Sequence, residues 1–366
     1  MMPRNANCRD RVFGRGRWVP FLTTTALVAA SCFSGRAAAA PPEPPNRTLQ
    51  IYFVDVEGGQ ATLFVTPEKE SLLIDTGWPD NGGRDADRIV SAAKLAGLSR
   101  IDYVLLTHYH MDHTGGVPQL VERIPVGAFI DHGPIREPGD KPTEDAWEAY
   151  QKVLAGKKVK RIVAKVGDTL PLKGLHAEVV SGDGVLLSKP LHGAGEPNPA
   201  CATTEKRATD QTENARSLGT IFRFGKVRLL DLGDLTWDKE LEMVCPDNLL
   251  GRVDVFIVSH HGWYQSNSPA LLAAIAPRIS IMDNGETKGG TPSTWEIVAH
   301  APRLEDLWQV HYSKDGGAAH NVPDARIANL MGTDAGNYLK LTVSPDGRLE
   351  VFNSRTKEAK QYAAPM

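Results

Sequence analysis

Residues 107–116 concentrate metal-binding side chains and constrain this chain more than any other stretch. Their sequence, Thr-His-Tyr-His-Met-Asp-His-Thr-Gly-Gly, places three histidines and one carboxylate within six residues, directly after an apolar run. The run predicts a buried strand, and alternate residues of an extended backbone point the same way, so His108 and His110 are expected to share one metal ion. Asp112 and His113 are then expected to face a second ion. Imidazole and carboxylate ligands favour zinc, and they also suit manganese or iron.

The pattern His-x-His-x-Asp-His at residues 108–113 resembles the signature of the metallo-β-lactamase superfamily. The resemblance implies an αββα sandwich, which is an α/β fold of two mixed β-sheets flanked by helices. The alternative is that the histidines bind no metal and form a pH-sensitive switch, because histidine titrates near neutral pH. The specific spacing and the polar residues that follow other expected strands favour the metal site.

Later segments are expected to complete the site. Asp234 follows a glycine at a strand end and resembles the superfamily's bridging carboxylate, although aspartate in that position can also cap a helix. One of the two histidines at 260 and 261 should complete the second ion, and we favour His260 because it leaves its strand first. Two ions that activate a shared water predict hydrolysis without a protein nucleophile. Asp112 or Asp234 would receive the proton of the water, and His261 would contact the substrate or protonate the leaving group.

Three further residues are secondary candidates. Asp75 ends a hydrophobic strand and is expected to accept a hydrogen bond from a ligating histidine, with turn capping as the alternative. His132 follows another strand end, where it either lines the same cleft or serves the structure. Asp183 occupies the turn in which many superfamily members carry a third histidine for the first ion. Either Asp183 replaces that histidine, or the first ion has fewer protein ligands and binds more weakly.

Three stretches resemble the hydrolase domain of ComEC-type competence proteins, a branch associated with nuclease activity. They are residues 54–61, residues 213–218 with Asn214 as a further secondary candidate, and His260-His261-Gly262 followed by Ser266 and Ser268. The resemblance covers roughly residues 50 to 285. Where the branch has Gly-Gln-Gly-Asp after the first strand, residues 57–60 read Glu-Gly-Gly-Gln, so one carboxylate is missing. The resemblance implies hydrolysis of phosphodiester bonds.

The first forty residues differ in kind from the rest of the chain. Arginines precede an apolar run, and alanines follow it, which predicts a signal peptide over residues 1–40 and an exported protein, periplasmic or extracellular. An uncleaved anchor and a lipoprotein attached through Cys32 are the alternatives. Residues 41–48 are expected to form a proline-rich leader. Residues 49–366 are expected to form one hydrolase domain with an irregular insertion at 190–211 and a C-terminal extension.

Removal of residues 1–40 would change the balance from 41 basic and 44 acidic residues to 35 and 43, because that segment holds six arginines and one aspartate. The acidic remainder disfavours duplex nucleic acid and favours a small molecule or a short, single-stranded phosphodiester as the substrate. No integral membrane segment is expected after signal removal. A lactam or lactone hydrolase and a non-catalytic secreted metal-binding protein are the alternative functions.

Three features lie outside these motifs. Cys201 and Cys245 would be the only cysteines left after processing, and one disulfide or two free thiols fit the sequence equally well. Lys288 and His311 either reach an anion of the substrate or serve the structure.

Overall fold

The computed structural model describes residues 47–79 and 81–364. The expected signal peptide, including Cys32, and residues 41–46 of the expected leader lie outside this range. None of the helices in the described part combines the length and the apolar composition that crossing a bilayer requires.

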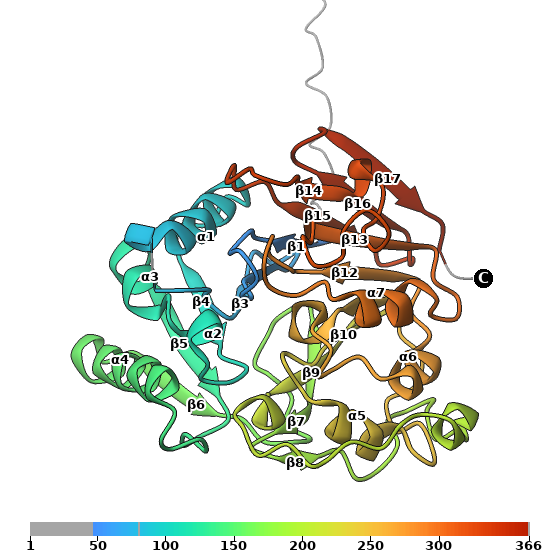
Figure 1. Ribbon diagram of the computed structural model, residues 1–366. Helices are drawn as coiled ribbons and strands as arrows, with labels where there is room; N and C mark the ends of the chain where they lie inside the picture. Colours follow the sequence, from blue (N-terminus) through green and yellow to red (C-terminus); the bar gives the residue numbers. More distant parts are fainter. Residues whose placement is uncertain (1–46, 80, 365–366) are drawn as a thin grey trace, which may run out of the picture. The chain divides into compact units, whose positions relative to one another are not determined.

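Two mixed β-sheets form the centre of the fold (Figure 1). The strands of the first sheet are β1 (Leu49–Phe53), β2 (Thr62–Val65), β3 (Ser71–Ile74), β4 (Ile101–Leu105), β5 (Val126–Asp131), β6 (Lys160–Val163), β15 (Leu339–Val343), β16 (Leu349–Asn353) and β17 (Glu358–Tyr362). Their order is β17-β16-β15-β1-β2-β3-β4-β5-β6. Strands β3 to β6 are parallel and the other neighbours are antiparallel.

The second sheet has the same mixed character. Its strands are β7 (His176–Gly182), β8 (Val185–Leu186), β9 (Gly219–Phe224), β10 (Val227–Asp231), β11 (Val255–Ile257), β12 (Ile279–Met282), β13 (Asp306–His311) and β14 (Ile327–Asn329). Their order is β14-β13-β12-β11-β10-β9-β7-β8, and β10 to β14 are parallel.

Helices cover the outer faces of both sheets. They are α1 (Arg84–Leu95), α3 (Val117–Arg123), α4 (Lys141–Lys157), α5 (Trp237–Val244), α6 (Pro269–Ile275) and α7 (Pro292–Ala299), whereas the single turn α2 (Met111–Thr114) follows the loop after β4. Apolar residues of α1, α3 and α4 pack against the first sheet, for example Ile89 and Leu120. Those of α5, α6 and α7 pack against the second, for example Met243 and Leu272.

A separate apolar layer joins the two sheets. Phe64 of β2 and Phe222 of β9 stack with ring centroids 4.6 Å apart, and both side chains are fully buried. Burying one such side chain stabilises the fold by about 1.5–3 kcal/mol. Helix, sheet, sheet and helix layers are therefore all present, and the expected αββα sandwich is confirmed.

The C-terminal segment is built into both sheets. Strands β12, β13 and β14 extend the second sheet, whereas β15 pairs antiparallel with β1, with Val343 opposite Leu49. These pairings join residues far apart along the chain, and local sequence patterns do not predict them. Cys201 in the insertion is bonded to Cys245, so the structure selects the disulfide from the two alternatives.

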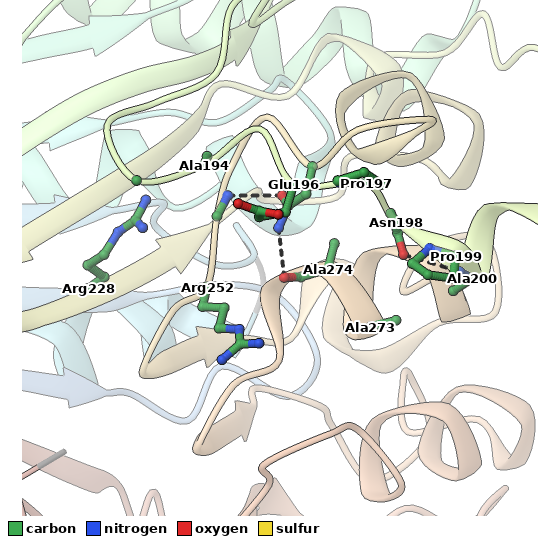
Figure 2. A pocket seen from close by; sticks show the side chains of 13 residues that line it. Ala194, Glu196, Pro197, Asn198, Pro199, Ala200, Arg228, Arg252, Ala273 and Ala274 are labelled. Carbon is green, nitrogen blue, oxygen red and sulfur yellow. Dashed lines mark hydrogen bonds between the residues drawn. The ribbon is translucent and has the colours of Figure 1, made fainter. Parts of the chain in front are cut away.

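A cavity of about 510 Å³ lies where the insertion meets α6 and the residues that follow α5 (Figure 2). Its lining includes Asn198, Arg228 and Arg252. The Asn198 side chain is held by the carbonyl groups of Val244 and Ala270, and the two arginines point in different directions. The polar groups of this cavity do not converge on a common point.

Candidate metal centre

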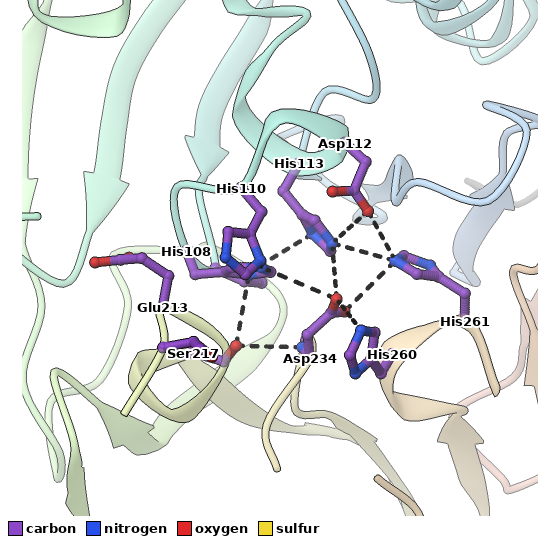
Figure 3. Close-up of polar contacts among 12 residues, drawn as sticks. His108, His110, Asp112, His113, Glu213, Ser217, Asp234, His260 and His261 are labelled. Atoms are coloured by element: carbon purple, nitrogen blue, oxygen red, sulfur yellow. Dashed lines mark hydrogen bonds and ion pairs between the residues drawn. The ribbon is translucent and has the colours of Figure 1, made fainter. Parts of the chain in front are cut away.

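Loops at the carboxyl ends of strands from both sheets assemble the candidate site. The loop after β4 and the short helix α2 come from the first sheet, and the loops after β10 and β11 come from the second. Figure 3 shows the predicted side chains that these loops bring together: His108, His110, Asp112, His113, Asp234, His260 and His261. A glycine is required where the first loop leaves α2, because a Cβ on Gly116 would lie 2.0 Å from the carbonyl oxygen of Thr76.

Four of these residues form a tight group. Ligand atoms of Asp112, His113, Asp234 and His261 all lie within 4.8 Å of one another. Nε2 of His113 is 3.2 Å from Nε2 of His261 and 3.2 Å from an oxygen of each aspartate. Nε2 of His261 is 3.2 Å from Asp112 and 3.5 Å from Asp234. Ligands arranged tetrahedrally around zinc are about 3.3 Å apart, so these four residues are spaced as ligands of one ion.

His108 and His110 form a looser second group. Nε2 of His108 lies 3.1 Å from Nδ1 of His110 and 3.9 Å from an oxygen of Asp234. Nε2 of His260 approaches the same oxygen of Asp234 at 3.3 Å. In the described residues, neither His108 nor His110 belongs to a set of three or more ligand atoms within 4.8 Å of one another. Asp234 is therefore the residue that both groups share.

The geometry differs from the expectation for the pair His260 and His261. His261, and not His260, joins Asp112 and His113 in the tight group. Both residues have a left-handed backbone, with φ of 53° and 52°, so the chain turns sharply at this point. Because of this turn, the ring of His261 reaches the ligands on α2, although His260 leaves the strand first.

A buried carboxylate orients the ring of His113 from the side that faces away from the metal-binding cluster. Oδ2 of Asp75 lies 2.7 Å from Nδ1 of His113, and it also accepts a hydrogen bond of 2.6 Å from the hydroxyl of Thr107. The same hydroxyl is 3.0 Å from Nδ1 of His108. With Nδ1 bonded to a carboxylate, Nε2 of His113 is free to act as a ligand. The geometry thus agrees with the supporting role expected for Asp75.

Two further carboxylates, which the sequence motifs do not contain, support the other rings. Oδ1 of Asp283 lies 3.4 Å from Nδ1 of His261, and Oε2 of Glu137 lies 3.1 Å from Nε2 of His110. Asp283 directly follows β12, so it stands at a strand end like Asp75, and that position is the signal that would have identified it. In each case the ring nitrogen that faces away from the centre has an acidic neighbour, as is usual for metal-binding histidines; Glu137 is hydrogen-bonded to its ring, whereas Asp283 lies at ion-pair distance only.

The charges in the tight group suit a cation. Burial alone raises the pKa of Asp234, but the neighbouring rings of His113, His260 and His261 outweigh it and hold that pKa well below its ordinary value. Burial likewise lowers the pKa of His261, but Asp234 and other acidic neighbours raise it to about 10. Burial lowers the pKa of His108 well below its ordinary value, which keeps its ring neutral. A metal ion would displace the proton of His261, and ionised carboxylates beside neutral imidazoles are the donor set that zinc and related ions bind.

The remaining secondary candidates lie outside the cluster. Nε2 of His132 bonds to the buried carboxylate of Glu213 at 3.0 Å. Asp183 accepts two hydrogen bonds of 2.6 Å from Arg136, so it does not replace the missing histidine as a ligand. The side chain of Asn214 is buried, and its oxygen has no hydrogen-bond partner among the described residues.

A second acidic group surrounds His311. Nε2 of His311 lies 2.6 Å from Asp55 and 3.5 Å from Glu57. Arg88 forms an ion pair of 2.8 Å with the other oxygen of Asp55, so a cation already neutralises this carboxylate. This arrangement serves the structure, and His311 does not reach the metal-binding cluster.

The departure at residues 57–60 has a structural counterpart. Nε2 of Gln60 donates a hydrogen bond of 2.6 Å to Asp231, which is fully enclosed below the loop that carries Asp234. Burial raises the pKa of Asp231 to about 7. A carboxylate in place of Gln60 would face a second carboxylate in a buried position, whereas the amide supplies a donor.

Residues 54–196 match the family model described as the metallo-beta-lactamase superfamily. A "lactamase-like protein nscB" of Aspergillus fumigatus is 33% identical over 126 residues, which is 31% of this chain and 36% of that protein. "Recombination protein 2" of Haemophilus influenzae is 26% identical over 317 residues, which is 86% of this chain and 31% of that protein. The matched stretch is thus about a third of the length of each of these relatives. Among solved structures, the metallo-beta-lactamase fold protein YhfI of Bacillus subtilis aligns at 12% identity and a TM-score of 0.44, covering 72% of this chain and 96% of that one.

The family model and the match to "recombination protein 2" agree with the resemblances that the sequence motifs indicated. The expected hydrolase class agrees with the superfamily that this model describes.

Proposed function

We propose that the chain is an exported, metal-dependent hydrolase of phosphodiester bonds in small or single-stranded substrates, and the match of residues 54–196 to the metallo-beta-lactamase superfamily model supports this. The observation that carries the metal-dependent part is the spacing of Asp112, His113, Asp234 and His261, which matches the ligand spacing around one ion. His108 and His110 would hold a second ion together with Asp234, less tightly because their ligand atoms are more widely spread.

Bound divalent ions, zinc being the best match to the ligands, would polarise the substrate and lower the pKa of an attacking water. The chain's own groups would orient this reaction. Asp112 and Asp234 are ionised, and a carboxylate that binds a metal through one oxygen keeps a second oxygen that can accept a proton from the water. His261 lies among the ligands, so it is not free to protonate the leaving group, and we withdraw that role from it.

Two observations support the choice of substrate and location. The match to "recombination protein 2" extends along 86% of this chain, and recombination involves the phosphodiester backbone of nucleic acid. The Cys201–Cys245 disulfide is typical of proteins that fold in an oxidising compartment, which supports export.

The test combines metal analysis with turnover of two substrates. Purified protein is loaded with zinc or manganese, its metal content is measured by elemental analysis, and hydrolysis of bis-p-nitrophenyl phosphate and of a chromogenic β-lactam is followed. We expect phosphodiester turnover that Asp234→Ala abolishes. His261→Ala should lose the tightly held ion, and His260→Ala should retain it. His300→Ala, on the exposed end of α7, is the matched control.

Each other outcome has a definite meaning. Hydrolysis of the lactam alone would replace the phosphodiester proposal with the amide or ester alternative. Metal binding without turnover of either substrate would support the non-catalytic alternative. Absence of bound metal after loading would refute the site itself.

A further inference from the structure

Lys288 reaches the metal-binding cluster from the loop between β12 and α7. Its ammonium nitrogen, Nζ, bonds to Oδ2 of Asp112, and it lies 5.0 Å from the centre of the Trp78 ring. The loop itself is docked on the site, because the backbone N–H of Gly290 donates a hydrogen bond of 2.9 Å to the carbonyl oxygen of His261. The position of the ammonium group is thus set by contacts with both halves of the sandwich.

The ammonium group lies at the solvent-facing edge of the cluster. The Lys288 side chain is 28% exposed, compared with 8% for Asp112 and 1% for His261. Across residues 47–79 and 81–364, no other lysine or arginine forms an ion pair with Asp112 or Asp234. Lys288 is therefore the one lysine or arginine side chain of the described residues that pairs with these aspartates.

A positive charge in this position is unfavourable for a site that holds cations, because like charges repel across a short distance. A neutral hydrogen-bond donor would satisfy Asp112 without that repulsion. The ammonium group has three donors, and Asp112 accepts from only one of them. The others are available to an anionic group that enters from solvent, and a lysine ammonium is a common ligand of phosphate oxygens.

We propose that Lys288 binds a negatively charged phosphate oxygen of the substrate beside the metal ligands. This inference rests on the proposed function, and it names the residue that favours anionic over neutral substrates. In the competing explanation, Lys288 only neutralises Asp112 and competes with the metal for it.

Three measurements on the full-length protein decide between the two explanations. The zinc affinity is measured by competition with a chromogenic chelator. The affinity of the zinc-loaded protein for inorganic phosphate is measured by calorimetry, and KM and kcat are measured with bis-p-nitrophenyl phosphate. The variants are Lys288→Met, which removes the charge, and Lys288→Arg, which keeps it. Lys152→Met, on the exposed face of α4, is the control for net charge.

We expect Lys288→Met to weaken phosphate binding and to raise KM, each by about tenfold or more, as loss of a hydrogen bond to a charged group predicts. Its zinc affinity should stay equal or rise slightly, and Lys288→Arg should recover most of the phosphate affinity. Unchanged phosphate affinity in Lys288→Met, together with tighter zinc binding, would overturn the proposal in favour of the competing explanation.

Two features keep the result interpretable. If Lys288→Met is poorly folded by circular dichroism, Lys288→Gln takes its place, because it retains a hydrogen-bond donor while removing the charge. If the zinc-loaded wild type hydrolyses neither substrate, the proposed function fails, and the phosphate titration still decides the role of Lys288 independently of turnover.

Discussion

Replacement of Asp75 by asparagine tests whether the residues behind the histidines set the affinity for metal. The carboxylate of Asp75 is fully buried and accepts three hydrogen bonds. They come from Nδ1 of His113 at 2.7 Å, from the hydroxyl of Thr107 at 2.6 Å and from the backbone N–H of Thr107 at 2.8 Å. An amide has one oxygen, and its NH₂ group would face a donor, so Asp75→Asn cannot accept all three.

Two effects of different size follow from this loss. Loss of the partner of a metal-binding histidine typically weakens metal affinity by about 10–100-fold, which is about 1.4–2.8 kcal/mol of binding free energy. A buried donor left without a partner lowers the free energy of unfolding by about 1–3 kcal/mol. We therefore expect Asp75→Asn to remain folded, with a reduced melting temperature and a clearly weaker zinc affinity in competition with a chelator.

A second buried aspartate supplies the control. Asp306 of β13 accepts a hydrogen bond of 2.7 Å from the hydroxyl of Tyr362 and forms an ion pair of 2.7 Å with Arg326. Asp306→Asn should lose a similar amount of stability and keep the wild-type zinc affinity. Equal zinc affinity in Asp75→Asn and the wild type, or an equal loss in both variants, would refute the reasoning that Asp75 acts through His113.

Three further predictions concern the fold. Burial raises the pKa of Glu240 to about 7 from an ordinary value of 4.5, so its contribution to stability is complete below the unfolded-state pKa and is lost as the pH rises through 7. The free energy of unfolding of the wild type, relative to that of Glu240→Gln, should therefore fall by about 3 kcal/mol between acidic and alkaline pH. A constant difference in unfolding free energy between the two proteins across this pH range would contradict the prediction. Replacing Cys201 and Cys245 by serine should lower the free energy of unfolding, measured by urea denaturation, by up to about 4 kcal/mol, because the disulfide closes a loop with a sequence separation of 44 residues. If reductant does not change the stability of the wild type, that result would argue against the bond. Gly116→Ala should lower both the melting temperature and the metal content, because the new methyl group would collide with the carbonyl of Thr76 and lower the free energy of unfolding by about 1–3 kcal/mol. A wild-type melting temperature and metal content would show that the loop can move aside.

Local chemistry was readable from the sequence alone. The spacing of His108, His110, Asp112 and His113 indicated a metal site, and the strand that precedes Asp234 indicated where its carboxylate would appear. An apolar run is a local property, so the run before His108 was recognisable as a strand, which the structure has as β4. The sandwich followed from the resemblance that these residues carry.

The tertiary structure decided which atoms meet. The left-handed turn after β11 selected His261 over His260 for the tight group, and no periodic pattern encodes that turn. Asp283 reached the ring of His261, and Glu137 reached His110, only because folding brings residues from separate loops together. The pairing of β15 with β1 likewise joins distant parts of the chain. The sequence specifies the type of each side chain, whereas the contacts that orient a metal ligand arise from the packing of segments far apart in sequence.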